Sequence, residues 1–316
     1  MDADRESIEA AMLDAVVTPD AYLNEIASHL IVAGGKRLRP VLAVAGAQIF
    51  GSAASHDVVR GGVACELVHL GSLYHDDVMD EADTRRGVET VNAKWGNLQA
   101  ILAGDFLLSR ASEIAASLGT EVAGLLARTI GWLCEGQIEE LRHTYDMNRT
   151  EESYLASIHG KTASLYGTAC RIGGIVAGHE RPAIDALTNY GNAYGTVFQI
   201  VDDILDLTST EEQLGKPAGH DIVEGVYTLP VLRTLALGTA AADELRDLLG
   251  APLDAVAQEK ALAIVRSNDG VQSAIDTAQD FVRRAEACCD DFPDSEATAA
   301  LRAAPRALLA ATPAAA

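Results

Sequence analysis

Apolar side chains recur every three or four residues over most of this chain, and this period limits its fold more than any other feature. Such a period places the apolar residues on one face of an α-helix. Aromatic residues make up only 5% of the chain. No stretch shows the alternation, bounded by Asn-Gly or Asp-Gly turns, that predicts a β-hairpin. The sequence therefore predicts an all-α protein.

Glycine and proline divide the chain into segments of helical length. The breaks fall at Gly34-Gly35, Gly51, Gly87, Gly119, 178–182, 215–219 and Pro293. The segments between them span about 15 to 30 residues, as bundle helices do. No linker rich in proline and serine separates them, so we expect a single domain over residues 1–316. The alanine-rich tail, residues 299–316, contains Pro305 and Pro313 and is expected to fray.

Composition and charge exclude several classes of protein. With 316 residues, of which 48% are hydrophobic and 22% charged, the chain can bury a large core. A net charge of -22 disfavours nucleic-acid binding, which needs an excess of lysine and arginine. There is no basic and apolar leader at the amino terminus and no long uncharged apolar window, so we expect a cytoplasmic protein without an integral membrane segment. The five cysteines lack metal-site spacing and are expected to be reduced.

Two aspartate triplets, each with the DDxxD pattern, carry the chemistry. They are Asp76, Asp77 and Asp80, and Asp202, Asp203 and Asp206. On a helix the first and last members share a face and can hold the same metal ions, whereas the second lies about 100° round. A single triplet is more often a solvated helix end. Two copies in apolar sequence instead indicate a compensating cation. Mg²⁺ suits all-oxygen sites and takes further ligands from substrate phosphates, so the triplets predict a diphosphate substrate.

Basic residues cluster as a diphosphate substrate would require. Lys36, Arg37 and Arg39 follow a Gly34-Gly35 turn that would open a helix. Arg85 and Arg86 directly follow the first triplet, Lys161 and Thr162 lie in a Gly-Lys-Thr sequence, and Lys216 follows the second triplet. The Gly-Lys-Thr sequence is not a P-loop, because Leu155 stands where the first P-loop glycine should be and no strand precedes it.

At this point the sequence resembles the trans-isoprenyl diphosphate synthases, also called polyprenyl synthetases, over about residues 34–230. The matching pieces are GGKRLRP from Gly34, ELVHLGSLYHDDVMDEADTRRG from Glu66, AILAGDFLL from Ala100, GKT from Gly160, FQIVDDILD from Phe198 and GKPAGHDIVEG from Gly215. Their joint occurrence in this order is very specific. The chain looks most like the bacterial long-chain members.

The resemblance implies a fold and an activity. The fold would be a bundle of more than ten helices around a central cavity, usually in a homodimer, with the two triplets at the cavity mouth. The activity would be a Mg²⁺-dependent condensation of isopentenyl diphosphate with an allylic diphosphate (1'-4, trans), with about three ions in each active site. Ionisation of the allylic diphosphate would give a carbocation that the second substrate attacks.

The resemblance also implies a role for each matching residue. Asp76, Asp80 and Asp202 would bind Mg²⁺ directly, with Asp77, Asp203 and Asp206 as further ligands or partners of ligands. The allylic diphosphate would be held by Arg85, Lys161, Gln199 and Lys216, and isopentenyl diphosphate by Lys36, Arg39, His69 and Arg86. Thr162 and Gln199 would stabilise the allylic cation. One position departs from the family: Val226 stands where lysine is common, which weakens the expected diphosphate binding at that corner.

Product length depends on the helix that carries Asp76. Cys65, Val68, Gly71 and Ser72 would face the growing prenyl tail. The family commonly stops elongation with a bulky aromatic residue four or five positions before the first aspartate, where this chain has Ser72 and Gly71. We therefore expect a product of C20 or longer. The alternatives are a geranylgeranyl or farnesyl diphosphate synthase, with another wall, such as Phe106 or a partner-subunit residue, closing the pocket.

Three other kinds of protein share parts of this pattern. A di-iron carboxylate bundle would use Glu66 with His69 and Glu140 with His143, but would leave both triplets unexplained. A non-catalytic partner subunit would usually lack one triplet, and a terpene cyclase would carry Asn, Ser or Thr and Glu in its second metal motif. A long apolar product would bring the enzyme into loose peripheral contact with membranes.

Overall fold

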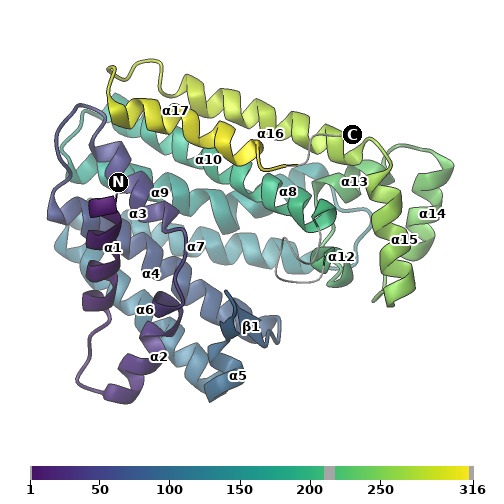
Figure 1. Ribbon diagram of the computed structural model, residues 1–316, viewed down its shortest axis with the longest axis horizontal. Helices are drawn as coiled ribbons and strands as arrows, with labels where there is room; N and C mark the ends of the chain where they lie inside the picture. The colour runs from purple at the N-terminus through teal and green to yellow at the C-terminus, as the bar shows by residue number, and fades with distance from the viewer. Residues whose placement is uncertain (1, 210–217, 313–316) are drawn as a thin grey trace. The chain divides into compact units, whose positions relative to one another are not determined.

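The computed structural model describes residues 2–209 and 218–312, and these residues are almost entirely helical (Figure 1). They form more than ten helices, so the all-α prediction is confirmed. Up to the second triplet these are α1 (Asp2–Ala15), α2 (Ala21–Val32), α3 (Leu38–Ala47), α4 (His56–Met79), α5 (Val91–Trp95), α6 (Asn97–Ser117), α7 (Thr120–Arg142), α8 (Glu151–Ile158), the π-helical turn η1 (His159–Ala163), α9 (Ser164–Val176) and α10 (Arg181–Thr208). Within the described ranges, no helix has both the length and the apolar character needed to cross a membrane.

Shorter helices follow the second triplet. They are α12 (His220–Val223), α13 (Leu229–Leu235), α14 (Ala240–Leu248), α15 (Ala255–Arg266), α16 (Gly270–Ala287) and α17 (Glu296–Leu309). Figure 1 shows α14 and α15, which contact one another, as a neighbouring pair. Side chains at several helix starts accept a backbone N–H: Thr150 caps α8, Thr239 caps α14 and Asp254 caps α15.

A small hairpin interrupts the helices directly after the first triplet. Strand β1 (Thr84–Arg85) pairs antiparallel with β2 (Val88–Glu89). The loop residues Arg86 and Gly87 have φ angles of 55° and 78°, and positive φ at both positions is what a tight two-residue hairpin loop requires. The hairpin was not predicted because its loop is Arg-Gly and its strands are only two residues long. It determines where Arg85 and Arg86 lie relative to α4.

The chain forms two compact units. The first contains Met1–Ile130, Leu165–Gly191 and Asp291–Ala300, and the second contains Gly131–Ser164, Asn192–Asp290 and Leu301–Ala316. The first triplet therefore belongs to the first unit and the second triplet to the second.

Helix α4 lies at the centre of the first unit and packs most extensively against α6 and α3. Its residues are buried on nearly every side, so it lacks the single apolar face of a surface helix. Small residues bring α4 and α6 together: a Cβ atom on Gly71 would lie 3.0 Å from the carbonyl oxygen of Gly104, and one on Gly104 would lie 3.1 Å from that of Gly71. This close approach fixes the end of α4 that carries Asp76.

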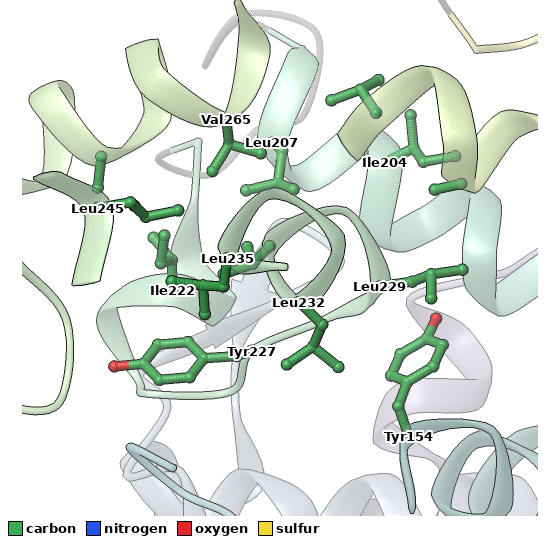
Figure 2. Packing of buried hydrophobic residues seen from close by; sticks show 14 of the residues in the cluster. Tyr154, Ile204, Leu207, Ile222, Tyr227, Leu229, Leu232, Leu235, Leu245 and Val265 are labelled. Carbon is green, nitrogen blue, oxygen red and sulfur yellow. The ribbon is translucent and has the colours of Figure 1, made fainter. Parts of the chain in front are cut away.

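The core of the second unit is built around α10, α13 and α15 (Figure 2). Ile204 and Leu207 of α10 pack with Leu229 and Leu232 of α13 and with Val265 of α15. Two buried tyrosines, Tyr154 and Tyr227, lie in the same cluster. A buried phenolic hydroxyl needs a hydrogen-bond partner, so each tyrosine constrains its surroundings.

The carboxyl-terminal tail differs from the prediction. Instead of fraying from Ala299, the chain is helical through Leu309, with Pro305 inside α17. Arg306 pairs with Glu286 of α16, and Leu308 and Leu309 pack on the core of the second unit. These contacts offset the helix disruption that proline causes. The last four residues of the predicted tail lie outside the described part of the chain.

Candidate functional site

The first aspartate triplet ends α4, and its three members differ in exposure. Asp76 is half-buried, Asp77 is fully buried and Asp80, the C-cap residue, is exposed. This division agrees with the helical period, which separates the second position from the first and third. Asp77 accepts a hydrogen bond from Nε of Arg85 at 2.5 Å. Burial raises the pKa of Asp77, and Arg85 opposes that rise. Asp77 thus holds the hairpin, while Asp76 and Asp80 share the other face.

Burial and the charges of four arginines act on His69 in the first unit. Burial first, and then Arg39, Arg86, Arg85 and Arg37, hold the pKa of His69 well below its usual range. His69 is therefore neutral at neutral pH. Arg39 is buried, with its guanidinium 4.4 Å from the ring centroid of Tyr166, and its Nε has no hydrogen-bond partner among the described residues. A buried unpartnered donor in a cationic cluster fits an anionic ligand.

Arg37 and Arg86 shape the turn that presents these cations. Arg37 is 1% exposed, has a φ angle of 50°, and bonds to Glu9 at 2.8 Å and to the carbonyl oxygen of Ile31 at 2.7 Å. Arg86 donates to the carbonyl oxygens of Leu30 and Gly34. Lys36, which directly precedes Arg37 in the turn before α3, is exposed. Arg37 was not given a substrate role in the sequence, and its burial supports a structural one.

The second triplet lies within α10 and is arranged differently. Asp202 is exposed, whereas Asp203 and Asp206 are each 3% exposed. The carboxylate of Asp206 accepts the backbone N–H of Asp221 at 3.2 Å, and its carbonyl oxygen accepts that of Gly219 at 2.7 Å. Asp206 thus fastens the turn that begins α12.

Asp203 has a protein partner on each carboxylate oxygen. The hydroxyl of Tyr154 donates to Oδ2 at 2.5 Å, and Nε2 of Gln199 donates to Oδ1 at 2.8 Å. Burial raises the pKa of Asp203 to about 7, although both hydrogen bonds oppose that rise. Burial and the neighbouring Asp203 also raise the pKa of Tyr154 well above its usual range, so the phenol keeps its proton and donates it.

The Gly-Lys-Thr sequence forms the π-helical turn η1, where α8 passes into α9. Helix α7 approaches this turn so closely that a Cβ atom on Gly136 would lie 2.3 Å from the backbone nitrogen of Lys161. Single π-helical turns are frequent at functional sites. Nζ of Lys161 contacts Oε1 of Glu140 at 2.6 Å, and the hydroxyl of Thr162 donates to Oε1 of Gln199 at 2.8 Å. Lys161, Thr162, Gln199 and Asp203 are thus gathered in the second unit.

The remaining predicted positions are placed as follows. Cys65 and Val68 are buried in α4, Ser72 is half-buried, and Gly71 faces Gly104 and Leu108 of α6. Val226 is half-buried, and its backbone N–H donates to the carbonyl oxygen of Asp221. Lys216 lies outside the described residues.

Tyr154 and Glu140 were not recognised in the sequence as residues of the site. Glu140 was considered only as half of an iron motif with His143, yet it pairs with Lys161. Glu66 of the other candidate iron motif pairs with Arg37 at 3.5 Å. These contacts leave the di-iron alternative without support. Tyr154 could have been suspected from its place two helical turns before Lys161, in a segment with few other apolar anchors.

The donors near the triplets have the chemistry that Mg²⁺ requires. All are carboxylate oxygens, and cationic groups for phosphate lie close to each triplet. Over residues 2–209 and 218–312, no group of three His, Cys, Asp or Glu side chains is assembled as a ready metal site. Mg²⁺ fits such a partial set of ligands, because it commonly takes the rest from water and substrate phosphates.

Comparisons with known proteins agree with this chemistry. The family model described as polyprenyl synthetase matches residues 20–265. The chain is 40% identical over 298 residues to the nonaprenyl diphosphate synthase of Mycobacterium tuberculosis, a match that covers 93% of this chain and 89% of that protein. It is 38% identical over 300 residues to heptaprenyl diphosphate synthase component 2 of Geobacillus stearothermophilus, covering 95% of this chain and 93% of that one.

A solved structure is similar over nearly its whole length. The polyprenyl synthase from Caulobacter crescentus, crystallised in complex with calcium and isoprenyl diphosphate, superposes with a TM-score of 0.92 at 32% identity. The superposition covers 99% of this chain and 96% of that chain.

Proposed function

Because this chain belongs to the polyprenyl synthetase family, we propose that it condenses isopentenyl diphosphate with an allylic diphosphate (1'-4, trans) to make a long-chain polyprenyl diphosphate. It is a prenyltransferase of that family. The observation that carries the finer assignment is that each aspartate triplet lies near a cation that suits phosphate. Arg85 contacts Asp77 of the first triplet, and Lys161 lies in the turn whose Thr162 bonds to Gln199, the partner of Asp203.

We assign Mg²⁺ to Asp76, Asp80 and Asp202, with about three ions in each active site. These three carboxylates are half-buried or exposed, whereas Asp77, Asp203 and Asp206 are buried and hold groups of the protein itself. The calcium in the Caulobacter crescentus enzyme supports a divalent cation. When bound, Mg²⁺ would neutralise charge on the leaving diphosphate.

The cations divide between the two substrates. Isopentenyl diphosphate would bind to Lys36, Arg39 and Arg86, with neutral His69 as a hydrogen-bonding partner. The unpartnered Nε of Arg39 supports this assignment. The allylic diphosphate would bind to Arg85, Lys161 and Lys216, with Gln199 close by. Arg85 and Lys161 each contact a carboxylate, Asp77 and Glu140 respectively, which keeps their side chains in place.

The reaction needs no nucleophilic side chain. The C1–O bond of the allylic diphosphate breaks, C4 of isopentenyl diphosphate bonds to the resulting C1 cation, and a proton leaves C2 for the released diphosphate. The oxygens of Thr162 and Gln199 would stabilise the cation, because each presents lone-pair density and neither is charged. Fixing two substrates in line would supply a further large part of the rate.

We propose that the enzyme is a homodimer and that α6 contributes to the contact. Leu98, Ile101 and Leu102 of this helix are 74%, 41% and 66% exposed, an apolar patch of the kind that marks protein interfaces. The name of the Geobacillus stearothermophilus relative, component 2, raises the alternative of a catalytic subunit that needs a different partner. Measuring the size of the purified chain, with and without product, distinguishes the two. A dimer formed by this chain alone supports the homodimer, and a monomer supports the need for a different partner.

We further propose one catalytic domain that works in the cytoplasm. The family match spans sequence from both compact units, which supports their acting together. All five cysteines are free, as suits a reducing compartment. The expected central cavity would accept the growing chain, and an apolar product would bring the enzyme to membrane surfaces.

We propose that the product is C20 or longer. Small residues at 71 and 72 support a long product, and a geranylgeranyl or farnesyl diphosphate synthase is the alternative. The test is to incubate the enzyme with Mg²⁺, isopentenyl diphosphate and, in turn, dimethylallyl, geranyl, farnesyl and geranylgeranyl diphosphate. Sizing the dephosphorylated products would support the proposal if chains of C20 or longer form. Absence of any condensation product with all four primers would refute it.

A further inference from the structure

Four side chains in the second unit form one continuous line of hydrogen bonds. Tyr154 donates to Asp203 at 2.5 Å, Gln199 donates to Asp203 at 2.8 Å, and Thr162 donates to Gln199 at 2.8 Å. The line begins inside the hydrophobic core, where Tyr154 is 1% exposed, and ends at Thr162, which is 8% exposed. It connects the core of the unit to the two residues assigned above to the allylic cation.

The chemistry of the carboxylate fixes the direction of every bond in the line. In its ionised form Asp203 can only accept hydrogen bonds, and its two oxygens accept from the hydroxyl of Tyr154 and from Nε2 of Gln199, so the NH₂ group of Gln199 faces Asp203. The carbonyl oxygen of Gln199 then necessarily points the other way, where it accepts the hydroxyl of Thr162. Because the hydroxyl of Thr162 donates its hydrogen to Gln199, its oxygen can only accept from any further neighbour.

The start of the line is held rigidly. The ring of Tyr154 packs with Leu229 and Leu232 of the core cluster (Figure 2). The guanidinium of Arg149, a residue that is 5% exposed, lies 5.6 Å from the centroid of this ring. A hydroxyl on a ring fixed in this way has little freedom to leave Asp203.

From this geometry we infer that Tyr154 is a positioning residue for the allylic cation, acting through Asp203 and Gln199 on the oxygens of Gln199 and Thr162. This inference rests on the proposed function and deepens it. Without the Tyr154 hydroxyl, one oxygen of Asp203 is left unsatisfied in the core, and the carboxylate can turn away from Gln199. The amide of Gln199 can then rotate and present its NH₂ group, a positive dipole end, toward the cation.

The hydrogen bonds also polarise the oxygens of Gln199 and Thr162 in the direction that stabilises a cation. Hydrogen bonds in a chain polarise one another in a low-dielectric interior. When Asp203 is ionised, its negative charge raises the electron density on the carbonyl oxygen of Gln199 and, through it, on the oxygen of Thr162. Asp203 thereby supports the cation without coming into contact with it, which explains why a carboxylate of the triplet lies buried with both oxygens bonded to protein groups.

Tyr154→Phe tests the inference, with Tyr227→Phe as the matched control. Both tyrosines are buried in the same cluster, and in Figure 2 their hydroxyls point in different directions. The hydroxyl of Tyr227 accepts the backbone N–H of Gly250 at 2.7 Å, away from the line. The rate is measured in a single turnover with enzyme in excess, so that product release does not mask the chemical step.

We expect Tyr154→Phe to lower the single-turnover rate about tenfold, with the KM of both substrates within about twofold of wild type. Tyr227→Phe should leave the rate within about twofold of wild type. Equal rates for the two variants, with wild type active, would overturn the inference while leaving the proposed function intact. An inactive wild type would instead count against the proposed function.

A double-mutant cycle with Thr162→Val separates positioning from simple destabilisation. If Tyr154 acts through Gln199 and Thr162, then Tyr154→Phe should lower the rate of Thr162→Val by less than about twofold. Tyr227→Phe should combine with Thr162→Val without any such coupling. If the double variant lost the product of the two single losses in rate, the effects would be independent and the inference would be contradicted.

Should Tyr154→Phe fail to fold, Asp203→Asn replaces it in the cycle. The asparagine keeps the shape of the side chain but can turn its own NH₂ toward Gln199, which breaks the same line. The expected result is again a rate about tenfold below wild type and little further loss in the presence of Thr162→Val. Full activity of Asp203→Asn would refute the inference.

Discussion

The two aspartate triplets share one spacing, yet their buried members hold different partners. In the first, Asp77 pairs with a charged group, Arg85, which the hairpin brings back from only eight residues further along the chain. In the second, Asp203 bonds to two neutral groups, Tyr154 and Gln199. The third members differ as well, because Asp80 is exposed at the end of α4 whereas Asp206 is buried within α10.

This difference teaches that the spacing of a motif does not determine the role of each residue in it. The first triplet stands where its helix ends, so its last member reaches solvent. The second lies in the last two turns of α10, where the turn that begins α12 packs against it, and its last member fastens that turn. We propose that the triplets share one task, binding the metal through their first members. Their second members contact different groups, the cation Arg85 at one site and the uncharged side chains of Tyr154 and Gln199 at the other.

The largest expected effect comes from the shared task. Asp76→Ala or Asp202→Ala should lower turnover about a thousandfold or more even at saturating Mg²⁺, because each removes a metal ligand. Helical content, measured by circular dichroism, should not change. The control is Asp57→Ala, which removes an exposed carboxylate from α4 that pairs with Arg60. Near-normal turnover of either variant would mean that the metal ligands are assigned wrongly.

Removing single cations should affect the binding of one substrate and not of the other. Arg39→Ala is expected to raise the KM of isopentenyl diphosphate about tenfold or more, and Lys161→Ala that of the allylic diphosphate, because each removes a charge-assisted contact. The KM of the other substrate should change little in each variant. Lys260→Ala, which breaks an exposed pair with Glu244, serves as the control. If both variants raised both KM values equally, the division of the cations would be incorrect.

A bulky side chain at residue 72 should shorten the product with less loss of stability than one at residue 71. Ser72→Phe is expected to shorten the product, measured by sizing the dephosphorylated chains. Gly71→Phe should also shorten it, but at a cost of about 1 to 3 kcal/mol in stability, because its Cβ would already lie 3.0 Å from the carbonyl oxygen of Gly104. Urea unfolding measures that cost. An unchanged product from both variants would locate the end of the pocket elsewhere.

The smallest effect concerns the four arginines of the first unit. Burial, together with these arginines, lowers the pKa of His69 in the folded protein, so below pH 6.5 the unfolded state binds more protons at this residue. Stability contributed by neutral His69 is present above pH 6.5 and is lost as the pH falls. Relative to His69→Gln, the wild type should therefore lose on the order of 1 kcal/mol between pH 6.5 and 5.5. If the urea midpoints of the two proteins changed with pH by the same amount, the folded protein would not lower the pKa of His69.

Much of the fold could be predicted because it depends on local rules. The helical period gave the all-α class, and glycine and proline gave most of the boundaries. The β1–β2 hairpin was not predicted because Arg86 adopts a positive φ, which is uncommon for arginine and cannot be inferred from the residue type. The helical tail escaped because contacts of Arg306, Leu308 and Leu309 outweigh the presence of Pro305.

The site was predictable in its residue types but not in its connections. The aspartates, Lys161 and Gln199 stand in recognisable motifs. Tyr154 and Glu140 act through contacts between segments that are distant in sequence, and no local pattern specifies such contacts. The burial of Asp203 and Asp206 depends likewise on what packs against α10, which only the tertiary structure reveals.

The most direct test compares two adjacent residues of the second triplet, Asp202 and Asp203. Each is changed to asparagine, and turnover is followed as Mg²⁺ is titrated. If Asp202 holds the metal and Asp203 organises protein groups, Asp202→Asn should raise the half-saturating Mg²⁺ concentration about tenfold or more. Asp203→Asn should leave that concentration nearly unchanged and lower only the maximal rate. A similar shift in Mg²⁺ requirement for both variants would contradict the account.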